Sequence, residues 1–256
     1  MKIDKTAIVH SGAGLAEDVN IGPYATIGEN VVIGPKTWVG SRATVEGWTR
    51  IGQGCRIFIG AVIGSITQDL KYKGQESQLI IGDNNTIREY VTINLGSDKK
   101  NQTIIGNDNL FMAYSHIAHD CIIGNRVVLA NGATLAGHVE IEDGAIVGGL
   151  VAIHQFTRVG TLAIVGGCSK VVKDVPPYSM ADGHPTKVYG LNSVGLRRAG
   201  VSGELRSNLK KAFKILCNPK LSIPSALERI KEEVPDSSEV AHLIQFIKSS
   251  KRGICR

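Results

Sequence analysis

Four of the seven histidines in this chain lie close together in the sequence: they are His116, His119, His138 and His154. An imidazole titrates near neutral pH, so it is suited to take a proton from a weakly acidic nucleophile. Asp120 follows His119 directly, and a carboxylate can hold the tautomer of an imidazole and stabilise its cation. The sequence thus allows two readings: a base with its orienting partner at His119 and Asp120, or an Asp120 that only shapes a turn.

Covalent catalysis and zinc chemistry are the alternatives to a base at His119. Covalent catalysis is disfavoured, because no serine or cysteine stands at a nucleophile-like position beside His119, and Cys121 is expected to be buried and inert. Zinc is the strongest rival, since an H-x-x-H spacing with a third histidine 19 residues later could gather around a metal. The five cysteines form no C-x-x-C pair, so a thiolate zinc site and a disulfide framework are not indicated. Direct transfer between two bound substrates is the simpler prediction, and zinc stays open as the alternative.

A six-residue repeat predicts the elements that position these residues. Steps of six from Ile3 to Val171 pass through 29 positions, of which 26 are apolar and only Asp69, Gln75 and Lys99 are polar. A period of six fits neither a helix nor an ordinary strand, and hexapeptide repeats indicate a parallel β-helix. Twelve of the apolar residues are followed by glycine, where we expect the turn because positive φ costs glycine least. Each six-residue repeat then forms one side of the β-helix, a short strand with its turn, and three sides make one coil of 18 residues.

The coil places the four histidines on one corner. Taken modulo 18, their positions are 8, 11, 12 and 10 in chain order. Adjacent coils lie about 4.8 Å apart, so these side chains can face one cleft. The polar interruptions of the series predict two loops extruded from the continuing coil, near 65–79 and 96–103, and such loops often carry function.

The repeat stops after Val171, so we expect a β-helical domain over 1–190 and a helical domain over 191–256. Ser202 is predicted to cap a helix with apolar residues at helical spacing, and further helices are expected over 224–233 and 237–249. The 30 glycines and the aromatic content of only 5% also favour a repetitive β architecture.

The positive charge belongs to the C-terminal part of the chain. From Arg197 onward there are 13 Lys/Arg and 6 Asp/Glu, a net +7, which leaves 16 against 17, or −1, for the first 196 residues. A basic surface favours an acidic protein partner. Nucleic acid is disfavoured because Phe213 and Phe246 fall on apolar helix faces. The start lacks the apolar region of a secretory signal and no apolar run nears about 20 residues, so we expect a cytoplasmic protein without a transmembrane segment.

Several motifs resemble those of the UDP-N-acetylglucosamine O-acyltransferase family, which begins lipid A synthesis. They are His116-Ile117-Ala118-His119-Asp120-Cys121, Leu135-Ala136-Gly137-His138, Val151-Ala152-Ile153-His154-Gln155-Phe156, Asp174-Val175-Pro176-Pro177-Tyr178, Gly195-Leu196-Arg197-Arg198 and Gln68-Asp69-Leu70-Lys71-Tyr72. The resemblance covers essentially the whole chain. The γ-class carbonic anhydrases share the β-helix, but their zinc histidines have a longer spacing that this sequence does not resemble.

The resemblance implies a left-handed parallel β-helix assembled as a homotrimer, with active sites between subunits. It also implies transfer of a 3-hydroxyacyl chain from acyl carrier protein to the 3-position of UDP-N-acetylglucosamine. His119 would be the general base, Asp120 its partner and the backbone N–H of Gly137 the oxyanion donor. The cleft would be lined by Asp69, Lys71, His116, His138, His154 and Gln155. The nucleotide end would be held by Asn192 and Arg198, and the acyl tail would meet Gly167 with its neighbour Ile164.

Lys170 is a further candidate for setting the acyl-chain length. Its position modulo 18 is 8, the same as that of His116 three coils earlier. We therefore expect it on the same corner, roughly 14 Å further along the axis, where a cation would close an apolar groove. The alternative is that Lys170 points to solvent and Gly167 alone sets the length.

The sequence departs from the common family pattern at a few positions. Asn94 and Leu95 stand where the family usually has His and Arg, Val194 replaces a frequent Glu, and Ala199 replaces a basic residue. These changes touch the nucleotide-sugar end, so a 3-amino acceptor is an alternative to the 3-hydroxyl. Two other classes are a zinc hydratase or a transferase for another nucleotide sugar, and a non-catalytic scaffold, against which the co-phased histidines argue.

Overall fold

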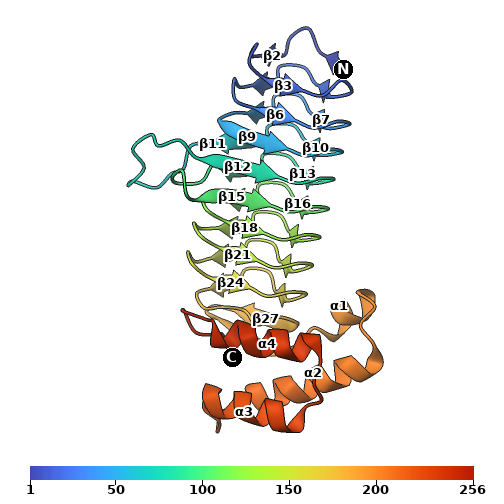
Figure 1. Ribbon diagram of the computed structural model, residues 1–256, viewed down its shortest axis with the longest axis vertical. Coiled ribbons are helices and arrows are strands. Elements are labelled where there is room, and N and C mark those ends of the chain that lie inside the picture. The colour runs from blue at the N-terminus through green and yellow to red at the C-terminus, as the bar shows by residue number, and fades with distance from the viewer.

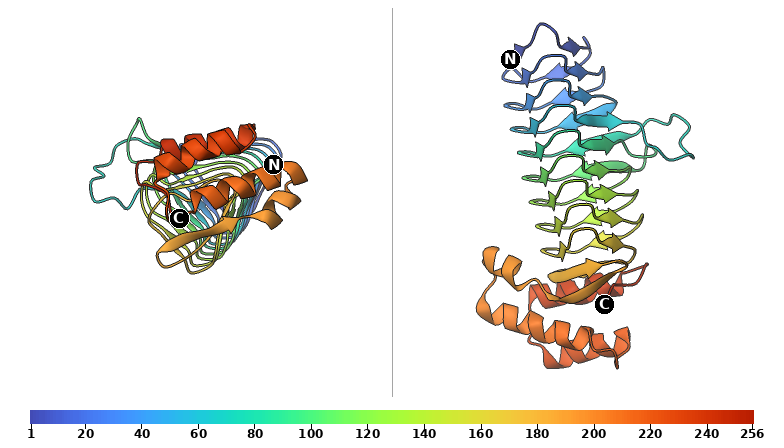
Figure 2. Two further views of the ribbon diagram at one scale, coloured as in Figure 1. Left: turned by 90° about the horizontal axis from the view of Figure 1, so that it is seen from below. Right: turned by 180° about the vertical axis from the view of Figure 1, so that it is seen from behind.

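The computed structural model describes residues 1–256 as a three-sided column of short parallel strands with helices packed against one end (Figure 1). Each coil contributes one strand to each of three sheets, here called A, B and C. Seen along its axis in Figure 2, the column has a rounded triangular cross-section. The expected left-handed parallel β-helix with a helical cap is thereby confirmed.

The strands succeed one another in each sheet as the chain winds down the column. Sheet A contains β1 (Lys2–Ile3), β4 (Asn20–Ile21), β7 (Trp38–Val39), β10 (Arg56–Ile57), β13 (Thr86–Ile87), β16 (Leu110–Phe111), β19 (Val128–Leu129), β22 (Ile146–Val147), β25 (Ile164–Val165), β27 (Ser179–Gly183) and β28 (Thr186–Leu191). Sheet B contains β2 (Ile8–Val9), β5 (Thr26–Ile27), β8 (Thr44–Val45), β11 (Val62–Ser65), β14 (Thr92–Asn94), β17 (His116–Ile117), β20 (Thr134–Leu135), β23 (Ala152–Ile153) and β26 (Lys170–Val171). Sheet C contains β3 (Gly14–Leu15), β6 (Val32–Ile33), β9 (Trp48–Ile51), β12 (Gln78–Ile81), β15 (Gln102–Ile105), β18 (Ile122–Ile123), β21 (Glu140–Ile141) and β24 (Arg158–Val159).

The apolar residues of the repeat stack into one continuous core inside the column. Ile57, for example, pairs in register with Val39 on one side and Ile87 on the other, and all three are fully buried. The first coil is different, because no coil covers its outer end: Ile3 is 40% exposed. The repeat thus predicts which side chains point inward, and the position along the column decides how deeply they are buried.

The glycines that follow the apolar residues allow close approach of neighbouring coils and do not form the turns, as had been expected. Only Gly64 among these twelve has positive φ. A Cβ at Gly34 would lie 2.7 Å from the carbonyl carbon of Gly52 in the next coil, so glycine is needed there for close approach of two coils. Positive φ falls three residues after the apolar position instead, as at Tyr24 and Asp120. The expectation that the glycine itself makes the turn was wrong.

Two loops leave the column on the same side (Figure 1). The first covers 66–77, between β11 and β12, and the second covers 95–101, between β14 and β15. Both are slightly shorter than predicted, because the strands of sheet C resume at Gln78 and Gln102. An ion pair of 3.2 Å between Lys99 Nζ and Glu76 Oε2 connects the two loops.

The column ends in a hairpin and four helices. The antiparallel strands β27 and β28 extend sheet A, and α1 (Ser193–Arg198), α2 (Gly203–Leu216), α3 (Ile223–Glu233) and α4 (Ser238–Lys248) follow. The last three helices confirm the prediction, and the hydroxyl of Ser202 accepts the N–H of Leu205 as an N-cap. The hairpin and α1 were not predicted from the sequence. No helix combines the length and the apolar character that crossing a membrane requires.

Candidate functional site

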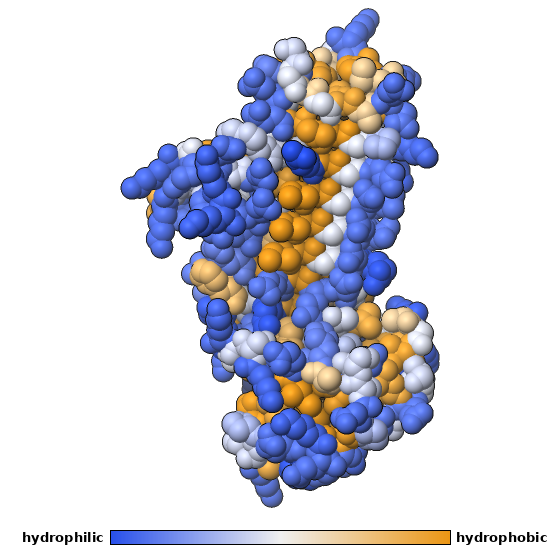
Figure 3. All heavy atoms as spheres, in the orientation of Figure 1, coloured by the Kyte–Doolittle hydropathy of each residue, from blue (hydrophilic) through white to orange (hydrophobic).

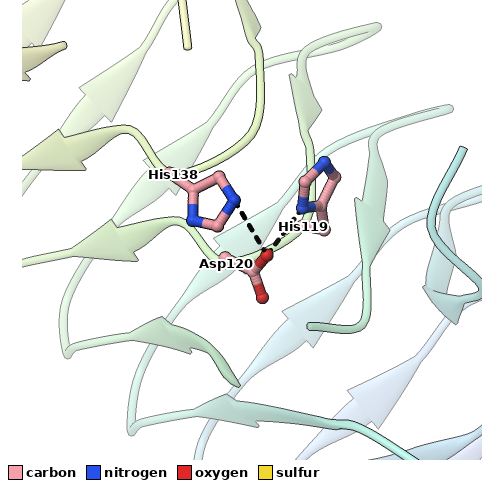
Figure 4. Close-up of side chains that lie close together, drawn as sticks. All are labelled: His119, Asp120 and His138. Carbon is pink, nitrogen blue, oxygen red and sulfur yellow. Dashed lines mark hydrogen bonds and ion pairs between the residues drawn. The ribbon is translucent and has the colours of Figure 1, made fainter. Parts of the chain in front are cut away.

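The predicted base and its partner lie at the corner between sheets B and C (Figure 4). His119 and Asp120 form the turn between β17 and β18, and His138 occupies the matching turn one coil further, between β20 and β21. His119 Nδ1 lies 2.7 Å from Asp120 Oδ2, and His138 Nε2 lies 3.3 Å from the same oxygen. The Asp120 side chain is only 4% exposed, so it is a buried partner of two imidazoles rather than a simple turn residue.

The hydrogen bond to Asp120 decides which nitrogen of His119 is available. A carboxylate only accepts, so Nδ1 must carry the proton, which leaves Nε2 as the free acceptor of the neutral ring. The ring lies over Gly137: a Cβ at that position would be 2.5 Å from Nε2 of His119. The N–H of Gly137 donates no hydrogen bond within the chain, although its carbonyl accepts one from Phe156. A free base nitrogen and an unpaired N–H donor therefore lie side by side.

His138 is held between two rings. It stacks on Phe156, with ring centroids 4.4 Å apart and planes 11° apart, and its edge meets the ring of His119 at 5.2 Å. Phe156 lies 18 residues after His138, at the same position in the next coil. The spacing of 18 residues from His138 is the sequence signal for this contact, although no role for Phe156 was predicted.

The other two histidines surround this centre without joining it. His116 is an outward residue of β17, and its Nδ1 lies 2.7 Å from Thr92 Oγ1. Burial, and secondarily the charge of His119, lower the pKa of His116, so its ring stays neutral at neutral pH. His154 and Gln155 follow β23 and are exposed, and His154 Nδ1 contacts only the carbonyl of Gln155, at 3.1 Å.

A cleft of about 450 Å³ opens beside Asp120 and His138 on the sheet C side. Its floor is formed by outward residues of sheet C together with Phe156, and its rim carries Lys100 from the second loop and Lys251 from the C-terminal segment. The cleft gives the His138 face of the centre access to solvent and to a ligand.

The remaining predicted substrate residues make no hydrogen bond with His119 and do not line this cleft. Asp69 and Lys71 are in the first loop, where Asp69 Oδ1 accepts the N–H of Lys71 at 2.9 Å. Asn192 is buried; its amide caps α1 by accepting from Gly195 N and donates to Leu162 O at 2.9 Å. The cap role accounts for its polar atoms, so its contact with a nucleotide stays a prediction. Arg198 is exposed at the end of α1.

The residues predicted to set the acyl-chain length, here called the ruler residues, are divided between two sheets. The register His116–Thr134–Ala152–Lys170 runs down sheet B, so Lys170 lies three coils below His116 as expected, and it is exposed. The expected corner position was wrong for both residues, because each is an outward residue of a strand. Ile164 lies on sheet A beside Met180. Gly167 is in the turn between β25 of sheet A and β26 of sheet B. This turn lies at the edge of sheet B opposite to the edge that carries His119.

Two of the departures from the family pattern are buried under the first loop. Asn94 is 2% exposed, and its Nδ2 donates to Ser65 Oγ and to Ile66 O. Leu95 is also 2% exposed and packs where a Cβ on Gly47 would stand. Both side chains therefore shape the base of the loops.

His119, Asp120 and His138 are also the residues that could hold a metal, since their donor atoms lie within 4.8 Å of one another. The separation of 2.7 Å between His119 Nδ1 and Asp120 Oδ2 is a hydrogen-bond length. Two ligands on a tetrahedral zinc ion lie about 3.3 Å apart, given bonds of about 2.0 Å. The arrangement fits a proton between the two groups better than it fits zinc.

Comparison with known proteins finds two matching family models. The model described as UDP-N-acetylglucosamine O-acyltransferase, domain 2, matches 174–255, and the one described as bacterial transferase hexapeptide (six repeats) matches 102–137. A protein from Thermodesulfovibrio yellowstonii named acyl-(acyl-carrier-protein)–UDP-N-acetylglucosamine O-acyltransferase is 54% identical, and the alignment covers 100% of this chain and 99% of that protein.

Solved structures agree over the same length. LpxA, a UDP-N-acetylglucosamine acyltransferase from Bacteroides fragilis, matches with a TM-score of 0.97 and 44% identity, covering 99% of this chain and 100% of that one. The UDP-N-acetylglucosamine acyltransferase of Francisella novicida matches with a TM-score of 0.96 and 42% identity, covering 99% and 94%.

Proposed function

Because the chain belongs to the UDP-N-acetylglucosamine O-acyltransferase family, we propose that it transfers a 3-hydroxyacyl chain from acyl carrier protein to the 3-position of UDP-N-acetylglucosamine. This is the first step of lipid A biosynthesis, and we place it in the cytoplasm. The observation that carries the proposal is the free Nε2 of His119 beside the unpaired N–H of Gly137.

The reaction follows from these two groups. Nε2 of His119 removes the proton of the sugar hydroxyl as its oxygen attacks the thioester carbonyl, and such help is worth about 10² to 10⁴ in rate. The carbonyl oxygen becomes negative and accepts the N–H of Gly137. When the C–S bond breaks, the thiolate takes the proton from Nε2. Asp120 keeps its hydrogen bond to Nδ1 and stabilises the imidazolium that forms.

Transfer without a covalent intermediate or cofactor is part of the proposal. Cys121 is the thiol next to the centre, but it is fully buried and donates to Ala136 O at 3.3 Å. Burial raises the pKa of its thiol to about 12, so it is not a nucleophile at neutral pH. The acceptor hydroxyl therefore attacks the thioester directly.

We infer that complete sites form between the subunits of a homotrimer. Within one chain, Gly167 and His119 lie at opposite edges of sheet B. A second copy of the chain is therefore needed to place Gly167 of one subunit near His119 of another. Figure 3 shows an apolar band along sheet C, whose outward residues include Val32, Ile104 and Ile122, exposed by 44%, 37% and 48%. An exposed apolar band of this kind favours contact with another chain.

The acidic acyl carrier protein has a matching surface on the cap. A groove of about 590 Å³ between the β27–β28 hairpin and α2 has an apolar floor that includes Tyr189 and Phe213. Its rim carries Lys210, Lys211 and Lys214, none of which is paired with a carboxylate. Lysines without carboxylate partners around an apolar floor suit an acidic protein, whose approach they would speed.

The test is a mass-spectrometric assay with UDP-N-acetylglucosamine, its 3-amino analogue and a ladder of 3-hydroxyacyl carrier thioesters. We expect a monoacylated nucleotide sugar and free carrier thiol. Absence of product with every donor and both acceptors would overturn the proposal, and product from the 3-amino sugar alone would change the acceptor.

The carrier surface is tested separately with the double variant Lys210→Glu/Lys214→Glu. We expect KM for the carrier-bound donor to rise about tenfold and its salt dependence to weaken, while a carrier-free acyl-pantetheine thioester reacts as before. The exposed Lys36 in the first coils provides the matched control, Lys36→Glu. Equal KM values for the double variant and this control would reject the surface.

A further inference from the structure

The Asp120 carboxylate is held by groups that the mechanism above does not use. Its Oδ1 accepts the backbone N–H of Ser97 at 2.7 Å, and its own N–H donates to Thr103 Oγ1 at 3.0 Å. Ser97 belongs to the second loop and Thr103 to β15, one coil before Asp120. We propose that Ser97 and Thr103 are positioning residues, and that the second loop is a clamp that keeps Asp120 aimed at His119.

The need for a clamp follows from the sharing of one oxygen. Oδ2 faces both His119, at 2.7 Å, and His138, at 3.3 Å. An unrestrained carboxylate could rotate and turn either oxygen to either ring. The Ser97 N–H occupies Oδ1, so Oδ2 alone is left for the imidazoles, and the carboxylate plane is fixed. The shorter contact then goes to the ring that must accept the proton.

The backbone of Asp120 needs the second anchor. The residue has φ of +60°, a conformation that non-glycine residues adopt rarely. Thr103 is fully buried, and its hydroxyl is the acceptor for the Asp120 N–H at this turn. The two anchors therefore act on different parts of Asp120: Thr103 fixes where the residue stands, and Ser97 fixes how its carboxylate is turned.

The second loop is built to present the Ser97 N–H. Asp98 Oδ1 accepts the N–H groups of Lys100 and Asn101, at 2.7 and 2.9 Å, which folds the loop back on itself. On the other side of Ser97, the Gly96 N–H donates to Gln78 O at 3.1 Å, which ties the loop to sheet C. Ser97 thus lies between two fixed points.

A pair of substitutions at one position isolates the donor. Ser97→Ala keeps the backbone N–H, whereas Ser97→Pro removes it. No side-chain hydrogen bond is lost in either variant, since only the N–H of Ser97 is bonded. We expect kcat of Ser97→Pro to fall about tenfold with KM for both substrates within about twofold. The acid limb of its kcat profile should move to lower pH, because less carboxylate stabilisation of the imidazolium is left. Ser97→Ala should match wild type.

A second pair addresses the backbone anchor and does not depend on how proline folds the loop. Thr103→Val removes the acceptor, and Thr103→Ser restores it. Thr37→Val is the matched control, because Thr37 is also fully buried and its hydroxyl accepts the N–H of Cys55 one coil on, at 3.0 Å. We expect the fall in kcat for Thr103→Val, rescue by Thr103→Ser and unchanged kcat for Thr37→Val.

The inference rests on the proposed function, and a spectroscopic measurement separates the two. Imidazole ¹⁵N spectra at neutral pH should show His119 protonated at Nδ1 in wild type and in Ser97→Ala, and a mixture of tautomers in Ser97→Pro and Thr103→Val. An inactive wild type with this pattern would reject the proposed function alone. Unchanged kcat and unchanged ring signals in both variants would overturn the clamp.

Discussion

The imidazole of His119 and the backbone of Gly137 touch across two successive coils, so closely that a Cβ on residue 137 would be 2.5 Å from the ring. No side chain fits at this distance without moving the ring. Glycine at 137 thus serves a close approach between two coils at the site, as Gly34 does further up the column.

We expect Gly137→Ala to lower kcat by about 100-fold or more, because the new methyl group displaces both the base and the N–H donor. The measurement is steady-state kinetics with saturating substrates. Gly203→Ala is the control, since a Cβ there would meet only the guanidinium of Arg206 at 3.8 Å, and activity should be unchanged. Near-normal kcat in Gly137→Ala would exclude Gly137 from the reacting centre.

His119→Ala should reduce kcat by about 10² to 10⁴ while the protein stays folded, because the ring lies on a corner outside the apolar core and Asp120 keeps its contacts with His138 and Ser97. His138→Ala and His154→Ala should raise KM more than they lower kcat. Retention of more than about a tenth of wild-type kcat by His119→Ala would mean that another group accepts the proton.

The repeat made the column and part of the site predictable from sequence. A six-residue apolar period leaves little choice of fold, and arithmetic modulo 18 correctly brings His119 beside His138. The same arithmetic puts Lys170 at the same position of its coil as His116, which the strand register confirms. These features repeat, so a sequence pattern can carry them.

Features that occur once could not be predicted in this way. Asp120 is buried because the second loop folds over it and donates the N–H of Ser97. Since this loop lies outside the repeat, the six-residue period does not predict where its residues stand. The helix α1 is six residues long and depends on the Asn192 cap, which is too little for a periodic signal. The glycine of the repeat was misread because crowding between coils is visible only when neighbouring coils are placed.

Chelation should leave the activity unchanged, and the purified protein should carry no stoichiometric zinc. The physical reason is the hydrogen-bond separation between His119 and Asp120, which is shorter than the spacing of ligands around zinc. The checks are elemental analysis and assays after exhaustive treatment with a chelator. Zinc near one equivalent per subunit, with activity that follows its removal and return, would support the zinc class instead.

An ion pair between the cap and the column should make stability depend on pH. His242 of α4 lies 3.2 Å from Glu142, which follows β21, and 2.9 Å from the hydroxyl of the buried Tyr178. The hydrogen bond with Glu142 raises the pKa of His242, which outweighs the lowering by burial and by Arg158, with Glu239 adding to the rise. Burial disfavours the charge of Glu142, yet hydrogen bonds from His242 and Thr161 leave its pKa lowered.

Because the pKa of His242 is raised in the folded state, the ion pair contributes its full stabilisation of the fold at pH values below the pKa of the unfolded state, about 6.5. This contribution is lost as the pH rises through the pKa of the folded state. We therefore expect His242→Ala to destabilise by about 0.5 kcal/mol more at about pH 5.5 than at about pH 8.5, the pair being partly exposed to solvent. Urea unfolding at both pH values measures the difference, with the exposed His10→Ala as control. An equal loss at both values would show that His242 acts by packing alone.

Lys170 and Gly167 should change the acyl-chain preference in opposite directions. Lys170 lies three coils below His116, roughly 14 Å along the axis, a length comparable to an extended chain of about a dozen carbons. Burying its ammonium beside methylenes is costly, so Lys170→Ala should shift the preference to longer chains. A Cβ on Gly167 would already be 3.3 Å from Gly149 O. If the acyl tail meets Gly167 as proposed, the long side chain of Gly167→Met should occupy part of its space and shorten the preferred chain. Competition assays with a ladder of acyl donors measure both, with the exposed Lys187→Ala as control. A Lys170→Ala profile equal to that control would leave Gly167 as the sole ruler.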